Sequence, residues 1–104
     1  MAGPVYKMFH ARWTEAWYQL SQEQRDAMFA KMTETGERLG AKQVVVCDSS
    51  WNSEKWLFWG VEEYPNIEAV QEYAKLLDEI NWFRYIESET LLGTALPQSS
   101  DSGS

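Results

Sequence analysis

The sequence predicts an α+β fold in which strands and helices follow in the order β-α-β-β-α-β. Residues 44–61 contain two runs of β-branched and aromatic residues around the polar break Asn52-Ser53-Glu54-Lys55, a pattern typical of a β-hairpin. Stretches with helical periodicity precede and follow this hairpin, and a strand is expected near each end of the chain. Because parallel crossovers need helices and are right-handed, this order predicts a four-stranded antiparallel sheet with two helices on one face.

The first strand is expected over residues 5–13, where side chains alternate between two faces. One face is apolar except for Lys7, and the opposite face is amphipathic. The apolar face holds Val5, Phe9, Ala11 and Trp13, and the amphipathic face holds Tyr6, Met8, His10 and Arg12. His10 and Arg12 therefore lie on one side of the sheet, roughly 7 Å apart along the strand, and could contact one ligand.

The first helix is expected to begin at a capping box in residues 21–24. There the Ser21 hydroxyl and the Gln24 side chain can satisfy each other's open backbone N–H groups. A stripe at helical spacing continues to Leu39, and Gly40 is the expected C-terminal stop. The sequence therefore predicts a helix over residues 21–39.

The hairpin strands carry apolar residues on both faces. This pattern is expected when one face meets helices and the other lines a barrel or a dimer core. The second helix should begin after Asn66, a plausible N-cap, and follow its apolar stripe to Trp82. A last, short strand is expected within residues 86–94. Residues 1–96 thus form one expected domain, and residues 97–104, rich in Pro, Ser and Gly, are expected to be a disordered tail.

Composition narrows the classes of function. Cys47 and His10 are the chain's one cysteine and one histidine, so neither an intramolecular disulfide nor an ordinary His/Cys zinc site is expected, and we expect no metal. A net charge of −7 argues against nucleic acid as a partner.

With no apolar signal region or long apolar run, secretion and membrane contact are not expected, and the prediction is a cytoplasmic protein. The 14% aromatic content favours a small-molecule ligand or self-association.

Four segments resemble a small uncharacterised family within the dimeric α/β-barrel superfamily. They are WYQLSQEQR at 17–25, CDSSW at 47–51, FWGVEEYP at 58–65 and WFRY at 82–85, and the resemblance spans residues 5–94. It implies a ferredoxin-like domain whose sheet packs face to face with that of a second copy, forming a homodimer. It also implies a ligand held between sheet and helices or inside the barrel. The superfamily includes cofactor-free monooxygenases, polyketide cyclases, haem enzymes and proteins without a known activity.

The candidate catalytic residues are chosen for acid/base chemistry. His10 is the natural general acid or base, because its unperturbed pKa is near neutrality, although it could equally bond a strand neighbour. Asp48 interrupts an apolar strand and either orients His10 or Arg12 or lies where the strand meets water. Arg12 and Tyr85 could hold a developing oxyanion, with a surface ion pair and an ordinary buried hydrogen bond as their structural alternatives.

The candidate substrate-binding residues are mostly aromatic. They are Tyr6, Trp51, Trp56, Trp59 and Arg84. The tryptophans could wall an apolar cleft or fill the core, and Arg84 could close the cleft. Cys47 is expected to be an inert thiol. We expect no cofactor, since a haem would depend on His10 as its axial nitrogen ligand.

These residues predict a cofactor-independent enzyme acting on a hydrophobic aromatic or polyketide-like molecule. The expected chemistry is proton transfer leading to cyclisation, isomerisation or oxygenation. One alternative is a non-catalytic module that binds or senses a small molecule in the same cleft. Another is a structural dimer whose cleft is filled by its own tryptophans.

Overall fold

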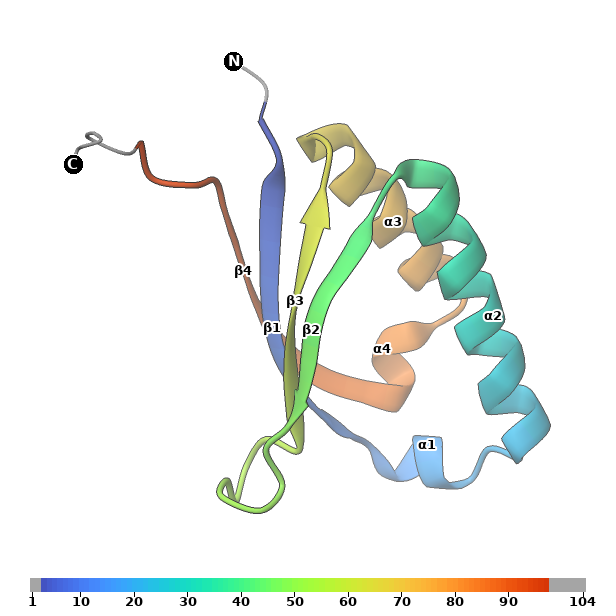
Figure 1. Ribbon diagram of the computed structural model, residues 1–104. Helices are drawn as coiled ribbons and strands as arrows, with labels where there is room; N and C mark the ends of the chain where they lie inside the picture. Colours follow the sequence, from blue (N-terminus) through green and yellow to red (C-terminus); the bar gives the residue numbers. More distant parts are fainter. Residues whose placement is uncertain (1–2, 98–104) are drawn as a thin grey trace.

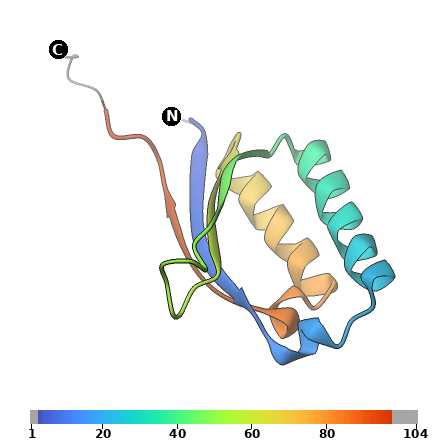
Figure 2. The same ribbon diagram turned by 60° about the horizontal axis from the view of Figure 1, so that its bottom comes forward.

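Four antiparallel strands form one sheet in the order β2-β3-β1-β4, and the helices lie on one side of it (Figures 1 and 2). The computed structural model describes residues 3–97. The strands are β1 (Val5–Trp13), β2 (Lys42–Asp48), β3 (Phe58–Tyr64) and β4 (Ile86–Gly93), and the helices are α1 (Glu15–Tyr18), α2 (Gln22–Leu39), α3 (Ile67–Glu79) and α4 (Trp82–Tyr85). The α+β prediction is confirmed, with α1 and α4 as two short additional helices. Apart from Pro97, the predicted tail lies outside the described residues.

Both long helices begin at the predicted caps. Ser21 Oγ accepts a hydrogen bond from the Gln24 backbone N–H at 3.1 Å, and the Gln24 side chain accepts one from the Ser21 N–H at 2.9 Å. Gly40 ends α2 with a φ of 77°, a conformation that favours glycine. Asn66 caps α3 through the Ala69 N–H at 2.8 Å. No helix within residues 3–97 is long and apolar enough to span a bilayer.

The two long helices differ in how closely they meet the sheet. The buried residues of α3 are Ala69, Val70, Tyr73, Leu76 and Leu77. In α2 the only buried residue is Thr35. The core therefore rests mainly on α3, and α2 spans the sheet without filling the space beneath it.

The hairpin loop is longer than the sequence predicts. Trp51 and Trp56 were expected in strands, but both lie in the connection of residues 49–57. The turn satisfies its own polar groups, since Trp51 Nε1 donates to the Asp48 carbonyl at 3.0 Å and the Trp56 N–H donates to Ser53 Oγ at 3.0 Å. Conversely, β4 is longer than predicted, because it pairs with β1 from Ile86 to Gly93.

The sheet has a helix face and an open face. Odd-numbered residues of β1 and even-numbered residues of β3 and β4 line the helix face, which confirms the two predicted faces of residues 5–13. On the open face, the pairing registers place four apolar side chains in one row across the strands. These residues are Val45, Val61, Met8 and Leu91.

An aromatic cluster closes one end of the helix face. Trp13 stacks on Trp17 with ring centroids 3.9 Å apart, and Trp82 meets both rings edge-on at 5.8 and 5.9 Å. Phe29 of α2 approaches Trp17 at 5.6 Å and Trp82 at 6.1 Å. Residues of β1, α1, α2 and α4 are in contact at this end, and they form an aromatic wall beside the space under α2.

Candidate functional site

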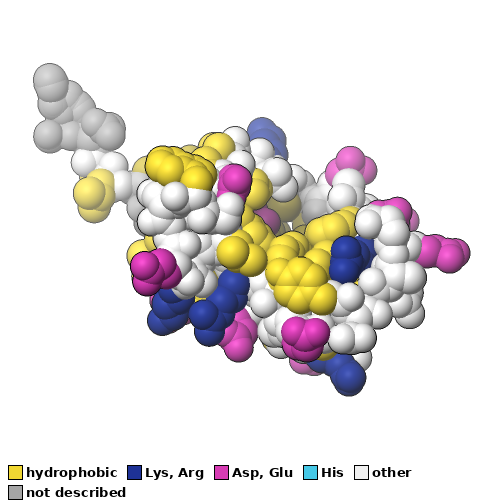
Figure 3. Space-filling view, turned by 90° about the horizontal axis from the view of Figure 1, so that it is seen from below, with side chains coloured by type: hydrophobic (Ala, Val, Ile, Leu, Met, Phe, Trp, Pro, Cys, Tyr) yellow, Lys and Arg dark blue, Asp and Glu magenta, His cyan; other side chains and the backbone are white. Residues whose placement is uncertain are grey.

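A cavity of about 670 Å³ lies between the helix face of the sheet and helices α2, α3 and α4. This volume is within the usual range for small-molecule sites. Hydrophobic side chains gather in the middle of the end view (Figure 3). The aromatic side chains that line the cavity are Phe9, Trp13, Phe29, Phe58, Tyr64, Tyr73, Trp82 and Phe83. The lining therefore favours an apolar, aromatic ligand.

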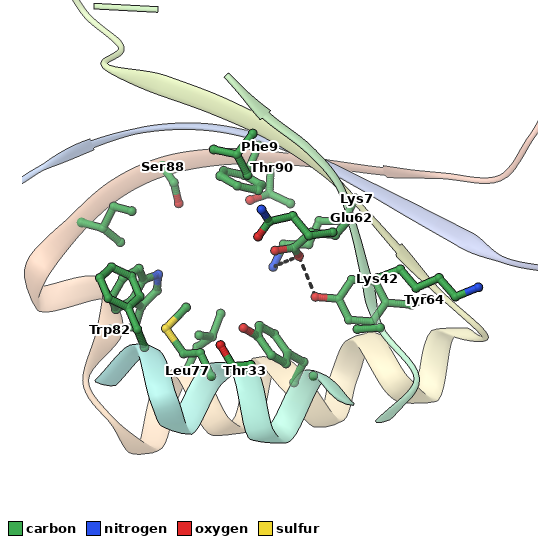
Figure 4. Close-up of a pocket in the computed structure, with 18 of the residues that line it drawn as sticks. Lys7, Phe9, Thr33, Lys42, Glu62, Tyr64, Leu77, Trp82, Ser88 and Thr90 are labelled. Atoms are coloured by element: carbon green, nitrogen blue, oxygen red, sulfur yellow. Dashed lines mark hydrogen bonds and ion pairs between the residues drawn. The ribbon is translucent and has the colours of Figure 1, made fainter. Parts of the chain in front are cut away.

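One charged pair lies in this apolar lining. Lys7 Nζ is 3.9 Å from Glu62 Oε1, and the Tyr64 hydroxyl donates to the same Oε1 at 2.7 Å (Figure 4). The side chains of Lys7 and Glu62 are only 16% and 21% exposed. Lys7 also lies 5.7 Å from the centre of the Tyr73 ring. An amine, a carboxylate and two phenols thus surround one end of the cavity.

Burial changes the proton affinities of this group. It lowers the pKa of the Lys7 amine, an effect that the Glu62 carboxylate partly offsets. Burial, followed by the nearby Glu62 charge, raises the pKa of both Tyr64 and Tyr73 above that of a free phenol. The phenols therefore remain hydrogen-bond donors, while the amine loses its proton more easily than a surface lysine.

These shifts predict a loss of stability at alkaline pH. The unfolded tyrosines ionise near pH 10.0, whereas folded Tyr64 and Tyr73 retain their protons. Above that pH the folded state binds more protons, so the free energy of unfolding should fall by up to about 1.4 kcal/mol per pH unit for each tyrosine. Lys7 acts oppositely, adding stability as pH rises from its lowered pKa to 10.5.

Urea titrations between about pH 9 and pH 11 measure the slope of the free energy of unfolding against pH. Tyr64→Phe should make it shallower, and Tyr18→Phe should not, because Tyr18 is 55% exposed. An unchanged slope in Tyr64→Phe would contradict the burial argument.

The predicted pair His10 and Arg12 lies on the open face. His10 Nε2 is 2.8 Å from Glu89 Oε1, and Arg12 Nε donates to Glu87 Oε1 at 2.7 Å. The His10 ring stacks on Trp56 at 4.2 Å, and Arg12 lies 5.7 Å from the same indole. The sequence was therefore right that these side chains share a face, but that face is turned away from the cavity.

A smaller hollow of about 300 Å³ adjoins this group. Its lining includes His10, Trp56 and Trp59. The structure thus brings together three predicted site residues here, with Arg12 beside them. His10 and Arg12 already have hydrogen-bond partners on β4, which is the structural alternative considered for each of them.

Asp48 does not orient His10, contrary to the sequence prediction. Its Oδ1 accepts hydrogen bonds from the Ser50 N–H at 2.9 Å and the Ser50 hydroxyl at 2.7 Å. These bonds, the hydroxyl first, lower the pKa of the fully exposed carboxyl. The partner that holds His10 is Glu89. An acid at the end of a strand is satisfied by the adjoining turn and meets water, as the alternative interpretation held.

The remaining predicted residues do not line the cavity. Tyr85 is half-buried and packs against the core, and Arg84 is exposed. Trp51 is 79% exposed in the hairpin loop. Tyr6 lies at one end of the open face, paired with Glu63 and Gly93.

The sequence analysis missed Lys7, Glu62, Tyr64 and Tyr73. The signal for Lys7 was its position as the one polar residue on the apolar face of residues 5–13. Glu62 occupies the same helix face on β3 and is paired directly with Lys7 in the sheet register. A charged residue on each of two apolar strand faces was the available sign of a buried pair.

Residues 7–101 match the model described as "Family of unknown function (DUF6616)". The chain belongs to this family. No curated protein matches the DUF6616 chain. A protein of unknown function from Rhodopseudomonas palustris is similar to it in structure, with a TM-score of 0.69 and 21% identity over 93% of this chain and 85% of that one.

Chlorite dismutase from Candidatus Nitrospira defluvii is also similar to the DUF6616 chain. One variant has a TM-score of 0.68 and 14% identity, covering 93% of this chain and 42% of its own. The complex with imidazole has a TM-score of 0.69 and 12% identity, covering 96% and 44%. The DUF6616 chain thus spans less than half of these dismutase chains, and the similarity shows a shared ferredoxin-like fold.

The donor set does not fit a haem ligated by imidazole in the cavity of this DUF6616 protein. His10 is the one histidine, and it lies on the opposite face of the sheet, bonded to Glu89. Within residues 3–97 there is also no group of three or more His, Cys, Asp or Glu side chains placed to hold a metal ion.

Proposed function

We propose that this DUF6616 protein binds a hydrophobic aromatic small molecule bearing a carbonyl group and transfers a proton at the carbon beside that carbonyl. The observation that carries the proposal is the Lys7–Glu62 pair within an aromatic cavity of about 670 Å³. An apolar lining supplies binding energy, and a few convergent polar groups supply orientation. This keeps the hydrophobic substrate class expected from the sequence and moves the acid/base chemistry from His10 to the Lys7–Glu62 pair.

Each member of the pair has a distinct role in the proposed step. The Glu62 carboxylate takes the proton from the α-carbon, and Lys7 stabilises the negative charge that develops on the ligand. Tyr64 holds Glu62 in place through its 2.7 Å hydrogen bond. Return of the proton at a different position would complete an isomerisation, and attack by the enolate would begin a cyclisation.

Binding can be tested with β-naphthol, an aromatic probe that has no carbonyl. Quenching of tryptophan fluorescence should give a saturable binding curve, because Trp13 and Trp82 line the cavity. Ser88 of β4 points into the cavity (Figure 4), so Ser88→Phe should weaken binding at least tenfold by filling it. Leu91→Phe, on the opposite face of the same strand, should bind normally. Equal affinity in Ser88→Phe and the unaltered chain would place the ligand elsewhere.

We also propose that a second copy of this chain covers the open face. The row of Val45, Val61, Met8 and Leu91 supports this, since Met8 is 44% exposed and Leu91 is 66% exposed. The hydrogen-bonded pair of His10 with Glu89 and the ion pair of Arg12 with Glu87 lie beside the row. An apolar strip with a charged margin is typical of an interface between identical subunits.

Sedimentation equilibrium tests the association. The unaltered chain should have twice its 12.1 kDa mass, and Leu91→Glu should be a monomer, because it would bury a charge within the strip. Leu96→Glu is a matched control, since Leu96 is 84% exposed beyond the end of β4. A monomer in the unaltered chain would contradict the proposal.

A further inference from the structure

We infer that Lys7 acts on the carbonyl ligand covalently, forming an imine between its Nζ and the carbonyl carbon inside the aromatic cavity. The inference rests on the proposed function and specifies the chemistry of the same site. It predicts that the ligands of this cavity include aldehydes and ketones that the protein captures covalently.

The position of the Lys7 amine is suited to attack on a ligand. The side chain points from β1 into the cavity (Figure 4) and is 16% exposed. Among the described residues, Glu62 is the one acid within 4.0 Å of Nζ, and their separation of 3.9 Å exceeds hydrogen-bond length. No protein group within residues 3–97 makes a hydrogen bond to Nζ. The amine is therefore near a proton acceptor without being held by it.

The other lysines lack this environment. Lys31, Lys42, Lys55 and Lys75 are all exposed. Lys75 pairs with Glu72 at 3.8 Å, and Lys55 lies over the Trp56 ring at 5.1 Å. Lys42 lines the edge of the cavity but remains in water. A desolvated lysine in an apolar pocket is the type of amine that forms Schiff bases, and here that description fits Lys7.

The step balances with the groups present. The neutral Lys7 amine attacks the carbonyl carbon, a C–N bond forms, and the carbonyl π electrons pass to oxygen. Glu62 takes a proton from the attacking nitrogen and returns it to the oxygen, giving a carbinolamine. The C–O bond then breaks with proton transfer from nitrogen to the departing hydroxyl through the same carboxylate. The products are an imine and water, and nothing is oxidised or reduced. Burial, which lowers the pKa of Lys7, supplies the neutral amine at lower pH than for an exposed lysine.

The test uses the full chain with β-naphthaldehyde and sodium cyanoborohydride, which reduces an imine to a stable amine. Intact mass and peptide mapping then give the number and position of adducts. We expect adduct formation at Lys7 at least tenfold faster than at any other lysine. Lys7→Arg should lose this adduct, because arginine keeps the charge beside Glu62 but forms no stable imine. Lys42→Arg should keep it.

Binding of β-naphthol, measured in parallel, separates the two proposals. Binding of β-naphthol to the unaltered chain, with a Lys7 adduct there and none at position 7 in Lys7→Arg, supports the inference. Binding of β-naphthol with adducts scattered equally over the exposed lysines overturns the imine and leaves the proposed function standing. If β-naphthol does not bind and no Lys7 adduct forms, both proposals are wrong.

Discussion

Glu62→Gln should slow deuterium exchange at the α-carbon of β-tetralone by roughly 10²- to 10⁴-fold, the usual contribution of a general base. β-Tetralone is an enolisable aromatic ketone of a size that the cavity of about 670 Å³ admits. The amide of glutamine can still accept the hydrogen bond that Tyr64 donates at 2.7 Å, so the local structure should persist. The measurement is the exchange rate in heavy water, followed by proton NMR.

His10→Gln is the decisive control for this prediction. The sequence analysis placed the acid/base role on His10, whereas the structure places its ring on the open face, 2.8 Å from Glu89. Exchange should therefore continue at the normal rate in His10→Gln. Loss of exchange in His10→Gln, with normal exchange in Glu62→Gln, would show that His10 on the open face is the general base and that Glu62 is not. Binding without exchange in the unaltered chain would favour the non-catalytic binding module.

Trp17→Ala should lower the free energy of unfolding by about 3–5 kcal/mol, the usual range for truncating a buried large aromatic residue. Trp17 is 5% exposed and stacks on Trp13 with centroids 3.9 Å apart. It also meets Phe29 and Trp82 edge-on, so its loss opens a hole where α1, α2 and α4 meet β1. Because Trp13, Phe29 and Trp82 line the cavity, the same change should weaken ligand binding.

Urea denaturation at a fixed protein concentration measures the effect, since association would make stability depend on concentration. Trp51→Ala is the matched control, because Trp51 is 79% exposed and makes one hydrogen bond to the Asp48 carbonyl. Its replacement should cost about 1 kcal/mol or less. Equal losses in the two variants would show that the aromatic cluster does not hold the elements together.

Local chemistry made much of the fold predictable. Residues 5–13 alternate with period two and form β1, and the caps at Ser21 and Asn66 begin α2 and α3. The predicted strand positions of Trp51 and Trp56 were wrong, because hydrogen bonds within the turn outweigh the strand preference of these residues. The length of β4 was hidden because its charged residues are stabilised by pairing with β1, a contact between distant parts of the chain.

The site was less predictable than the fold. Period two places His10 and Arg12 on one face and Lys7 on the other, but it does not reveal which face receives the helices. Both faces of the central strands carry apolar residues, so polarity gave weak guidance. In the sequence, Lys7 is simply the one polar residue on the apolar face of residues 5–13. The sheet register shows its significance, because it pairs Lys7 directly with Glu62. Such a pair depends on tertiary structure, which the sequence of either strand does not show.

The most direct test of the central claim is to locate bound β-naphthol by intermolecular NOEs in isotope-labelled protein. The account predicts NOEs from the naphthol protons to Thr33, Leu77 and Ser88, which surround the cavity from α2, α3 and β4 (Figure 4). NOEs confined to Met8 and Trp59, which line the hollow of the open face, would contradict it. That result would show that the ligand is held beside His10 and that the cavity under α2 is not the binding site.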